Sequence, residues 1–323
     1  MTKIVQCVPN ISEGADLEKI NRIIAPLKDK PGFKLISFEP DKDYNRTVIT
    51  LLGDPNSMIE PLIEFYIKAK EEIDMNNHKG AHPRMGAVDV CPFIPIANIK
   101  MDECIEFANK LGEEVSKKAN IPVFLYAEAA KNDDRILLPN IRKGEYEGMK
   151  EKIKEEKWHP DFGEAEIKTF GATAIGARMP LIAYNIDLDT KDEKQANLIA
   201  RRIRGSSGGF KYVQAGPAFL EQKNHMQVTM NILDYEKNDV YRIFETVKME
   251  AKRYQVDVIS SEVVGLIPKQ TLLRSIRYYL EVESLEYNKD MSLDEVTRLA
   301  IKYLKLRDFD TNKIIEAYLW TII

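Results

Sequence analysis

The segment 76–95, NNHKGAHPRMGAVDVCPFIP, holds two of the four histidines in this 323-residue chain. His78 and His82 are four residues apart, Gly80 lies between them, and Pro83 follows directly. An imidazole with an ordinary pKa of about 6.5 can accept and return a proton at physiological pH, and its neutral form can bind a metal. The two side chains could therefore be metal ligands, a catalytic acid and base, or part of an ordinary polar turn.

A metal pair at this spacing needs a helix that holds both imidazole rings on one face. Inside a helix, Gly80 would cost about 1 kcal/mol relative to alanine, and a proline such as Pro83 about 3 kcal/mol. His82 also precedes a proline, which favours extended backbone at that residue. We therefore expect a loop, and a loop disfavours the metal pair.

Two features favour a catalytic role for His82 over a polar turn. The loop leads directly into the apolar run 87–96, so a rigid strand would anchor it. Lys79, Arg84 and Asp89 flank it, and such charges can bind an anionic substrate or tune the pKa of an imidazole. We predict that His82 is a general acid and base, and a surface turn remains the alternative.

A second stretch, RGSSGGFKY at 204–212, could hold a phosphate through its backbone N–H groups. It has neither the GxxxxGK[ST] nor the GxGxxG spacing of the known phosphate-binding motifs. A flexible connection between a helix and a strand is the favoured interpretation.

The elements that must position these residues follow from hydrophobic periodicity. The first half is predicted to form strand, helix, strand, strand, helix and strand at 3–11, 15–28, 33–39, 46–53, 58–73 and 87–96. The second half repeats this order at 180–188, 194–204, 210–216, 226–235, 238–254 and 256–265. Between the copies lie a helix at 101–119, a strand at 123–130 and irregular charged sequence to about 179, and helices at 269–283 and 292–305 end the chain.

This repeated order is the βαββαβ pattern of ferredoxin-like units. We predict an α+β protein with subdomains 1–179 and 180–323. Small-molecule sites are common between domains, so we expect a binding cleft between the two sheets.

The composition is that of a soluble globular protein, with 44% hydrophobic and 30% charged residues. A net charge of −4 argues against nucleic acid as a partner, because such proteins usually present a basic face. No uncharged run approaches the roughly 20 apolar residues of a membrane span. Three cysteines without a CxxC spacing fit a reducing compartment, so we expect a cytoplasmic protein.

Six segments resemble the formiminotransferase family. They are QCVPNISEG (6–14), NRTV (45–48), HKGAHPRMGAVDVCPFIP (78–95), KWHPDFG (157–163), GATAIGAR (171–178) and VVGLIP (263–268). They follow the family's order over essentially the whole chain, and the block 78–95 is too long for a chance similarity. In animals this domain is fused to a cyclodeaminase, and we expect the stand-alone transferase because no such region follows residue 323.

The resemblance implies two ferredoxin-like halves, a tunnel between their sheets that binds tetrahydrofolate, and a homodimer. It implies transfer of the formimino group from N-formimino-L-glutamate to N5 of tetrahydrofolate, with release of L-glutamate. Tetrahydrofolate is then a co-substrate, and neither a metal nor a redox cofactor is expected.

The resemblance also implies site residues. The family's catalytic histidine falls on His82, and an acidic residue proposed to assist falls on Glu39, where the animal pattern has aspartate. The folate-binding segment falls on Gly163, Glu164, Ala165, Glu166, Ile167, Lys168, Thr169, Phe170 and Gly171. This segment is one residue shorter than the animal pattern and has Phe170 in place of tryptophan, where it is expected to offer the pterin a stacking face.

Both substrates carry carboxylates, and the candidate cations for them are Arg46, Lys79, Arg84 and Arg178. Two other functions stay open. The same site could exchange a formyl group between 5-formyltetrahydrofolate and glutamate. Paired βαββαβ units also build regulatory modules that bind amino acids without chemistry, so fold alone does not decide the function.

Overall fold

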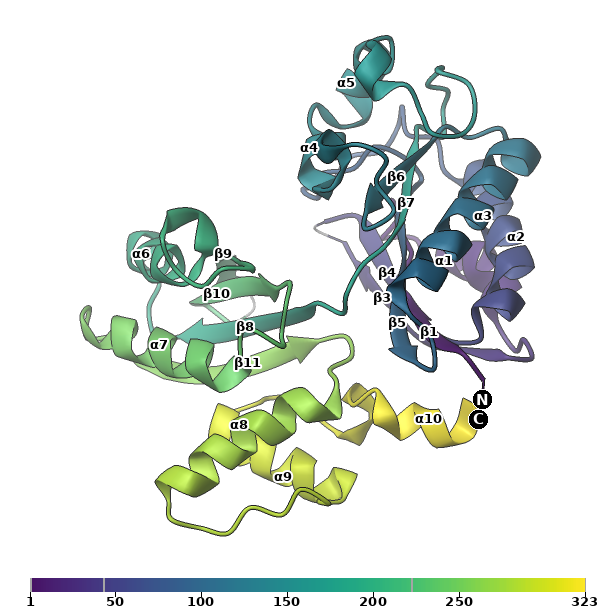
Figure 1. Ribbon diagram of the computed structural model, residues 1–323. Helices are drawn as coiled ribbons and strands as arrows, with labels where there is room; N and C mark the ends of the chain where they lie inside the picture. The colour runs from purple at the N-terminus through teal and green to yellow at the C-terminus, as the bar shows by residue number, and fades with distance from the viewer. Residues whose placement is uncertain (1, 43, 222, 323) are drawn as a thin grey trace. The chain divides into compact units, whose positions relative to one another are not determined.

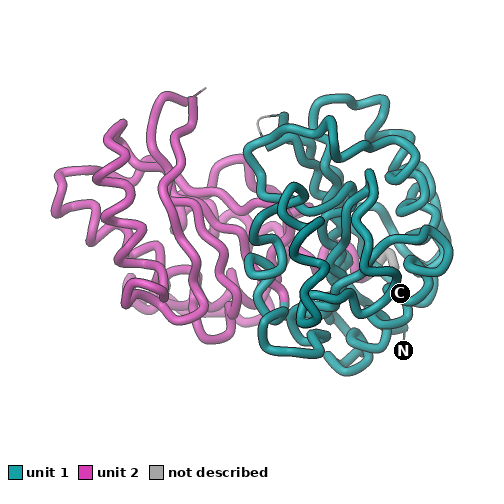
Figure 2. Tube along the Cα trace, turned by 90° about the horizontal axis from the view of Figure 1, so that it is seen from above, with its two compact units in different colours: residues 1–179, 322 teal, residues 180–321, 323 magenta. Residues whose placement is uncertain are grey.

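The computed structural model describes residues 2–42, 44–221 and 223–322. The chain divides into two compact units, residues 1–179 with 322 and residues 180–321 with 323 (Figure 2). Each unit has its own sheet and its own hydrophobic core. The protein is therefore of the α+β class, as the sequence predicts.

The first unit combines a mixed sheet with helices on both of its faces (Figure 1). Its strands are β1 (Ile4–Cys7), β2 (Asn10–Ile11), β3 (Phe33–Asp41), β4 (Arg46–Gly53), β5 (Val88–Ala97), β6 (Val123–Ala127) and β7 (Thr173–Ala177). Its helices are α1 (Leu17–Ile24), α2 (Pro55–Glu72), α3 (Met101–Ala119), α4 (Leu138–Arg142) and α5 (Glu145–Lys152). Single 3₁₀ turns occur at Ala25–Leu27, Asp133–Arg135 and Glu156–Trp158.

Strands β1 and β2 both pair with β4 and β5, so they are two parts of one interrupted strand. The sequence predicts one strand over 3–11. Pro9 explains the interruption, because a proline has no N–H to donate to a neighbouring strand. Beyond β5 the sheet continues with β7 and then β6, both in parallel. Strand β7 lies where irregular sequence is predicted, which is a correction to that prediction.

Apolar side chains on both faces of this sheet fix the helices. On one face α1, α2 and α3 bury Ile20, Leu62 and Leu111 completely. On the other face, α4 and α5 bury Ile141 and Met149 in a separate cluster over β5, β6 and β7. Helices α4 and α5 therefore bring their charged residues to the end of the sheet where β5 begins.

The second unit has a four-stranded antiparallel sheet, in the order β11-β8-β10-β9. Its elements are β8 (Ile182–Leu188), α6 (Glu193–Ile203), β9 (Val213–Leu220), β10 (His225–Ile232), α7 (Val240–Lys252), β11 (Val258–Val264), α8 (Lys269–Val282), α9 (Leu293–Leu304) and α10 (Glu316–Ile322), with 3₁₀ turns at Gly205–Ser207 and Thr311–Lys313. The first six elements follow the predicted order. Strand β9 continues past the predicted end at residue 216 because Pro217 is tolerated on an edge strand.

A buried polar network lies on this second sheet. Asp187 is fully buried and accepts hydrogen bonds from Gln227 Nε2, Ser260 Oγ and Arg307 Nε at 2.8, 2.7 and 2.7 Å. Burial acts to raise the pKa of Asp187, but these donors outweigh it and hold that pKa below its ordinary value. Donors from the second unit itself thus balance the negative charge of Asp187.

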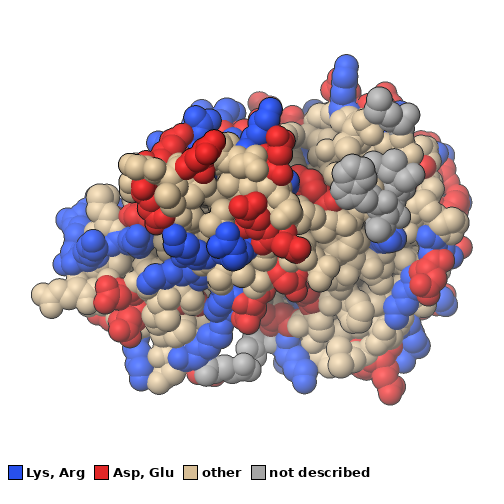
Figure 3. Space-filling model, turned by 90° about the horizontal axis from the view of Figure 1, so that it is seen from below, with Lys and Arg blue, Asp and Glu red and all other residues tan. Residues whose placement is uncertain are grey.

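Basic and acidic side chains lie interspersed on the face drawn in Figure 3. Across the described part of the chain, no helix combines the length and the apolar character needed to cross a membrane.

Candidate active site

The loop that carries both histidines runs from the end of α2 to the start of β5, as predicted, and rests on the β3–β4 turn. His78 Nε2 donates to the carbonyl oxygen of Asn45 at 3.0 Å, and the Asn45 side chain donates to the carbonyl of Lys79 at 2.7 Å. A Cβ at Gly80 would lie 2.4 Å from the carbonyl oxygen of Tyr44, so only glycine permits this approach. His78 therefore holds the loop in place.

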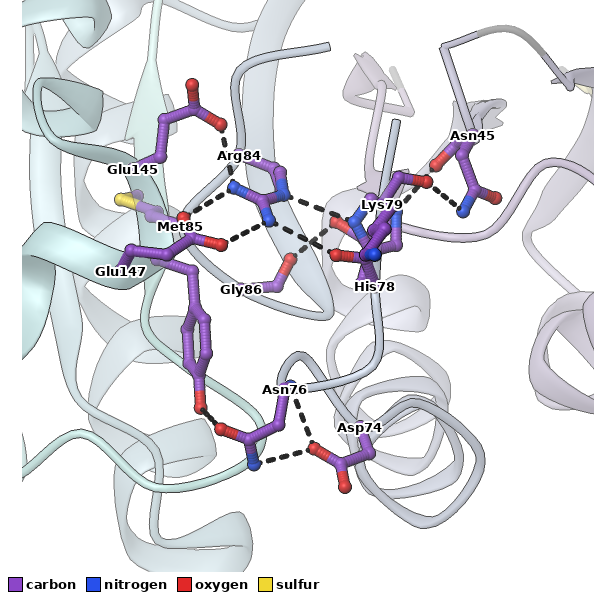
Figure 4. Close-up of polar contacts among 12 residues, drawn as sticks. Asn45, Asp74, Asn76, His78, Lys79, Arg84, Met85, Gly86, Glu145 and Glu147 are labelled. Carbon is purple, nitrogen blue, oxygen red and sulfur yellow. Dashed lines mark hydrogen bonds and ion pairs between the residues drawn. The ribbon is translucent and has the colours of Figure 1, made fainter. Parts of the chain in front are cut away.

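Arg84 is the second anchor of this loop (Figure 4). Its Nε donates to His78 Nδ1 at 3.1 Å, while Nη1 and Nη2 donate to Glu145 and Glu147 of α5 at 2.7–2.8 Å and to the carbonyl oxygen of His78 at 3.3 Å. All five N–H groups of this guanidinium are thus engaged. A substrate carboxylate could reach Arg84 only in exchange for one of these contacts.

Arg84→Lys should lower the free energy of unfolding by about 1–2 kcal/mol, because an ammonium cannot reproduce the planar fork of a guanidinium. Urea unfolding monitored by circular dichroism measures the loss. The matched control is Arg22→Lys, since Arg22 also makes a bidentate pair, with Glu72, but is exposed and should lose at most about 0.5 kcal/mol. Equal losses in the two variants would contradict a structural role for Arg84.

His82 faces Arg46 at the start of β4. Arg46 Nη1 lies 2.7 Å from His82 Nε2. A guanidinium can only donate, so His82 Nε2 accepts and the ring is neutral, with its proton on Nδ1. The ring of Tyr44 meets His82 edge-on, with centroids 6.2 Å apart. The structure thus fixes the tautomer that the sequence could not specify.

The surroundings of His82 lower its pKa to about 3. Burial is the largest cause, followed by the positive charges of Arg46 and Arg142 and by His78. The pKa of Arg46 is also lowered, first by burial and then by Arg142. Two arginines therefore surround a histidine that stays neutral at physiological pH.

This pKa predicts a loss of stability in acid. Between about pH 3 and about pH 6.5 the unfolded chain protonates His82 and the folded chain does not. The free energy of unfolding therefore falls as the pH drops through this window. Above about pH 6.5 the titration of His82 does not change it. His82→Asn, which cannot titrate, should therefore lose less unfolding free energy than the wild type between pH 7 and about pH 4. Urea titrations at both pH values measure this, and equal losses would contradict the low pKa.

Arg142, which reasoning from the sequence missed, belongs to this cluster. Its Nη2 makes an ion pair with Asp89 Oδ2, and Asp89 Oδ1 accepts from the backbone N–H of Met85 at 2.8 Å. Asp89 is 2% exposed, so its carboxylate is a fixed anchor at the start of β5. The Nε atoms of Arg46 and Arg142 are both buried and have no hydrogen-bond partner among the described residues.

The other predicted site residues divide between this cluster and more distant positions. Glu39 is opposite Val48 in the β3–β4 pair, and Arg46 lies two residues before Val48, so Glu39 and Arg46 share one face of the sheet. Lys79 is an exposed residue of the histidine loop. Arg178 follows β7, and its backbone N–H bonds to the carbonyl of Phe93. Phe93 is four residues beyond Asp89, so Arg178 lies roughly 13 Å further along the sheet than Asp89.

The segment Gly163–Gly171 lies beside the histidine loop. The backbone N–H of Met75 donates to the carbonyl of Thr169 at 2.8 Å, and Gly86 forms a bridge with Gly171. Gly163 and Gly171 have φ angles of +89° and +84°, which favour glycine. Residues 163–166 are exposed. The C-terminal end of the predicted folate segment is therefore in direct backbone contact with the loop that carries His82.

The ring of Phe170 is not exposed, although the sequence predicts a stacking face for the pterin there. Its side chain is 2% exposed and packs in the core, with its ring centroid 6.4 Å from that of Tyr66. The expected stacking face is thus buried, because the backbone turn at Gly171 directs this residue inward. Its place in the segment is structural.

The disfavoured alternatives find no support in the geometry. Both ring nitrogens of His78 are already bonded, so His78 and His82 do not form a ligand pair. Within the ranges that the structure describes, no three His, Cys, Asp or Glu side chains come together as a metal site would require. In the stretch 204–212, Ser207 Oγ bonds to Arg201 and Arg204, which makes it a local turn.

Comparison with known proteins identifies the family whose domains this chain contains. Residues 4–178 match the N-terminal subdomain of the formiminotransferase domain, and residues 183–320 match the formiminotransferase domain. The glutamate formimidoyltransferase of Streptococcus pyogenes is 47% identical over 90% of this chain and 98% of its own length. The glutamate formimidoyltransferase of Thermoplasma acidophilum is 43% identical over 88% of this chain and 94% of its own.

A longer relative agrees with these matches. The formimidoyltransferase-cyclodeaminase of Mus musculus is 39% identical over 99% of this chain and 60% of its own length. The family suggested by the histidine loop is thus confirmed by matches that extend through both units. The chain belongs to the formiminotransferase family.

Proposed function

We propose that this protein is a glutamate formimidoyltransferase, which transfers the formimino group of N-formimino-L-glutamate to N5 of tetrahydrofolate and releases L-glutamate. The observation that carries the proposal is the His82 loop. It bears the family's HPRMG motif, and Asn45, His78 and Arg84 hold it rigidly beside two arginines. The high identity to two enzymes of this name over most of both chains supports the same conclusion.

The reaction needs one proton to be taken and one to be given. N5 of tetrahydrofolate attacks the amidine carbon, and the C=N bond opens to a tetrahedral intermediate. N5 loses a proton and the glutamate nitrogen gains one. The C=N bond then re-forms as the bond between the glutamate nitrogen and the carbon breaks, which leaves the formimino group on N5. His82 Nε2 would perform both transfers, because it is unprotonated and lies on a fixed loop. No metal or redox cofactor is required by this sequence of steps.

The charged residues have distinct parts in the proposal. Arg46 and Lys79 would bind substrate carboxylates next to His82, and Arg178 would bind one further along the sheet. Glu39, on the face of Arg46, would stabilise the cationic amidine. Arg84 would act through the loop that it anchors. The exposed part of the segment Gly163–Gly171 would contact the pterin of tetrahydrofolate.

The fold-level expectations are part of the same proposal. We propose that each of the subdomains 1–179 and 180–323 is ferredoxin-like, that tetrahydrofolate binds in a tunnel between the two sheets, and that the enzyme is a homodimer. The strand order β11-β8-β10-β9 and the βαββαβ order in the second unit support the first point. Three buried free cysteines support a cytoplasmic location, where thiols stay reduced.

The direct test is turnover by the purified protein. Glutamate should be released only when N-formimino-L-glutamate and tetrahydrofolate are both present. N-formyl-L-glutamate serves as the alternative donor and should react more slowly. Absence of glutamate release with the formimino donor would overturn the proposal, and faster turnover of the formyl donor would favour formyl exchange.

A further inference from the structure

The surroundings of His82 carry more positive charge than the chain itself neutralises. Arg142 is paired with Asp89, but Arg46 makes no ion pair with any described residue. Asp41 and Asp89 act on Arg46 only at a distance. Their neighbour His82 is uncharged, so among the described residues the charge of Arg46 has no counter-ion in this half-buried place. Such an imbalance favours an anionic ligand.

Free donors accompany this charge. Arg46 uses Nη1 for His82, while its Nε is buried without a partner, and the same holds for Nε of Arg142. A buried N–H group without an acceptor loses its hydrogen bond to water, and a ligand oxygen would restore that bond. A carboxylate suits this arrangement, since guanidinium groups bind it through two parallel N–H bonds.

The bond between Arg46 and His82 also blocks the proposed chemistry. A neutral imidazole has one acceptor nitrogen, and Arg46 occupies it. A proton from N5 can reach Nε2 only after Nη1 has withdrawn. The loop that presents His82 is fixed by Asn45 and Arg84, so Arg46 is the partner that must move.

We propose that a carboxylate of the amino-acid substrate binds between Arg46 and Arg142, draws Arg46 away from His82, and so turns His82 into a base only when that substrate is present. This inference rests on the proposed function for the identity of the substrate. It assigns Arg142 as a substrate-binding residue and Asp89 as the residue that positions it.

The α-carboxylate is the group that fits. In N-formimino-L-glutamate it is separated by a single carbon from the nitrogen that takes the proton from His82. The carboxylates of tetrahydrofolate lie at the far end of its glutamate tail, separated from N5 by an aromatic ring. A carboxylate held beside His82 is therefore that of the amino acid.

Nitrogen NMR of the four histidines tests this in the whole protein. Free His82 should titrate far below pH 6, with the proton of its neutral ring on Nδ1, and L-glutamate should raise its pKa by about 1–3, the effect of an opposite charge within about 4–6 Å. L-isoglutamine, in which the α-carboxylate is an amide, should leave the pKa unchanged. The groups that face His82 among the described residues are Arg46, Tyr44, Arg142 and His78.

Two variants and two further ligands sharpen the test. Arg142→Met should abolish the response to L-glutamate, and Arg22→Met, which removes an exposed arginine of α1, should keep it. A pKa that rises with 5-formyltetrahydrofolate but not with L-glutamate would overturn the assignment to the amino acid. Pteroic acid, which lacks the glutamate tail, would then show whether the tail is the source.

The inference and the proposed function fail in different ways. If the enzyme turns over N-formimino-L-glutamate and L-glutamate leaves the pKa of His82 unchanged, the inference is overturned and the function stands. If L-glutamate raises that pKa and no turnover occurs, the carboxylate site stands and the function is overturned. In an active enzyme, the acid limb of kcat should also lie at higher pH than that of kcat/KM, because only the former reports the substrate complex.

Discussion

Replacement of His82 by alanine should lower kcat by about 10²–10⁴-fold while tetrahydrofolate still binds, because general acid–base catalysis typically contributes this much. The loop itself should survive the change, since His78 and Arg84 carry its anchoring contacts. Steady-state kinetics with N-formimino-L-glutamate and fluorescence titration with tetrahydrofolate measure the two quantities.

His159→Ala is the matched control for this experiment. His159 is exposed, and the contacts that the structure gives it use its backbone: its N–H donates to the carbonyl of Glu156, and its carbonyl accepts from Arg135. Its removal should leave kcat unchanged. Full turnover by His82→Ala would remove His82 from the mechanism, and loss of folate binding with unchanged kcat would make it a binding residue.

Gly86→Ala should destabilise the first unit by about 3 kcal/mol, within the range of severe overpacking. A Cβ at Gly86 would lie 2.0 Å from the carbonyl oxygen of Ala172 and 2.9 Å from its carbonyl carbon and nitrogen. These are backbone atoms at the start of β7, so the clash can be relieved only by moving the loop or the strand. Thermal and urea unfolding measure the loss.

The same substitution should lower activity in whatever fraction stays folded. A shift of about 1 Å in a catalytic group can cost about 10²-fold in rate, and Gly86 joins the His82 loop to the segment that ends at Gly171. Gly148→Ala is the control, since nothing lies within 4 Å of its added Cβ and alanine favours the helix α5 by up to about 1 kcal/mol. Wild-type stability in Gly86→Ala would show that the two segments are not tightly joined.

The sequence predicts the elements whose patterns are periodic. Alternating apolar residues in 46–53 and the helical spacing in 101–119 each lead to an element with the same bounds in the structure, β4 and α3. Strand β7 escapes prediction because TAIGA has a single large apolar side chain, Ile175, and therefore no alternating pattern. It is nonetheless fully buried between β5 and β6, where small residues fit.

The sequence predicts only those site residues that lie within a recognisable motif. The block 78–95 points to His82, but nothing in it reveals that Arg46 occupies the imidazole nitrogen. Arg142 lies 60 residues further along the chain in a five-residue helix, too short for a periodic pattern. Only the packing of α4 onto this face of the sheet brings Arg142 to Asp89. Long-range placement of charged groups is therefore what sequence reasoning could not supply.

The most direct test of the account is a crystal structure with 5-formyltetrahydrofolate and L-glutamate bound. The account predicts that His82 Nε2 lies within hydrogen-bond reach of N5, about 2.6–3.2 Å or one water molecule away, with a glutamate carboxylate on Arg46. A pterin bound with N5 far from His82, or His82 still held by Arg46 beside a bound glutamate, would contradict it.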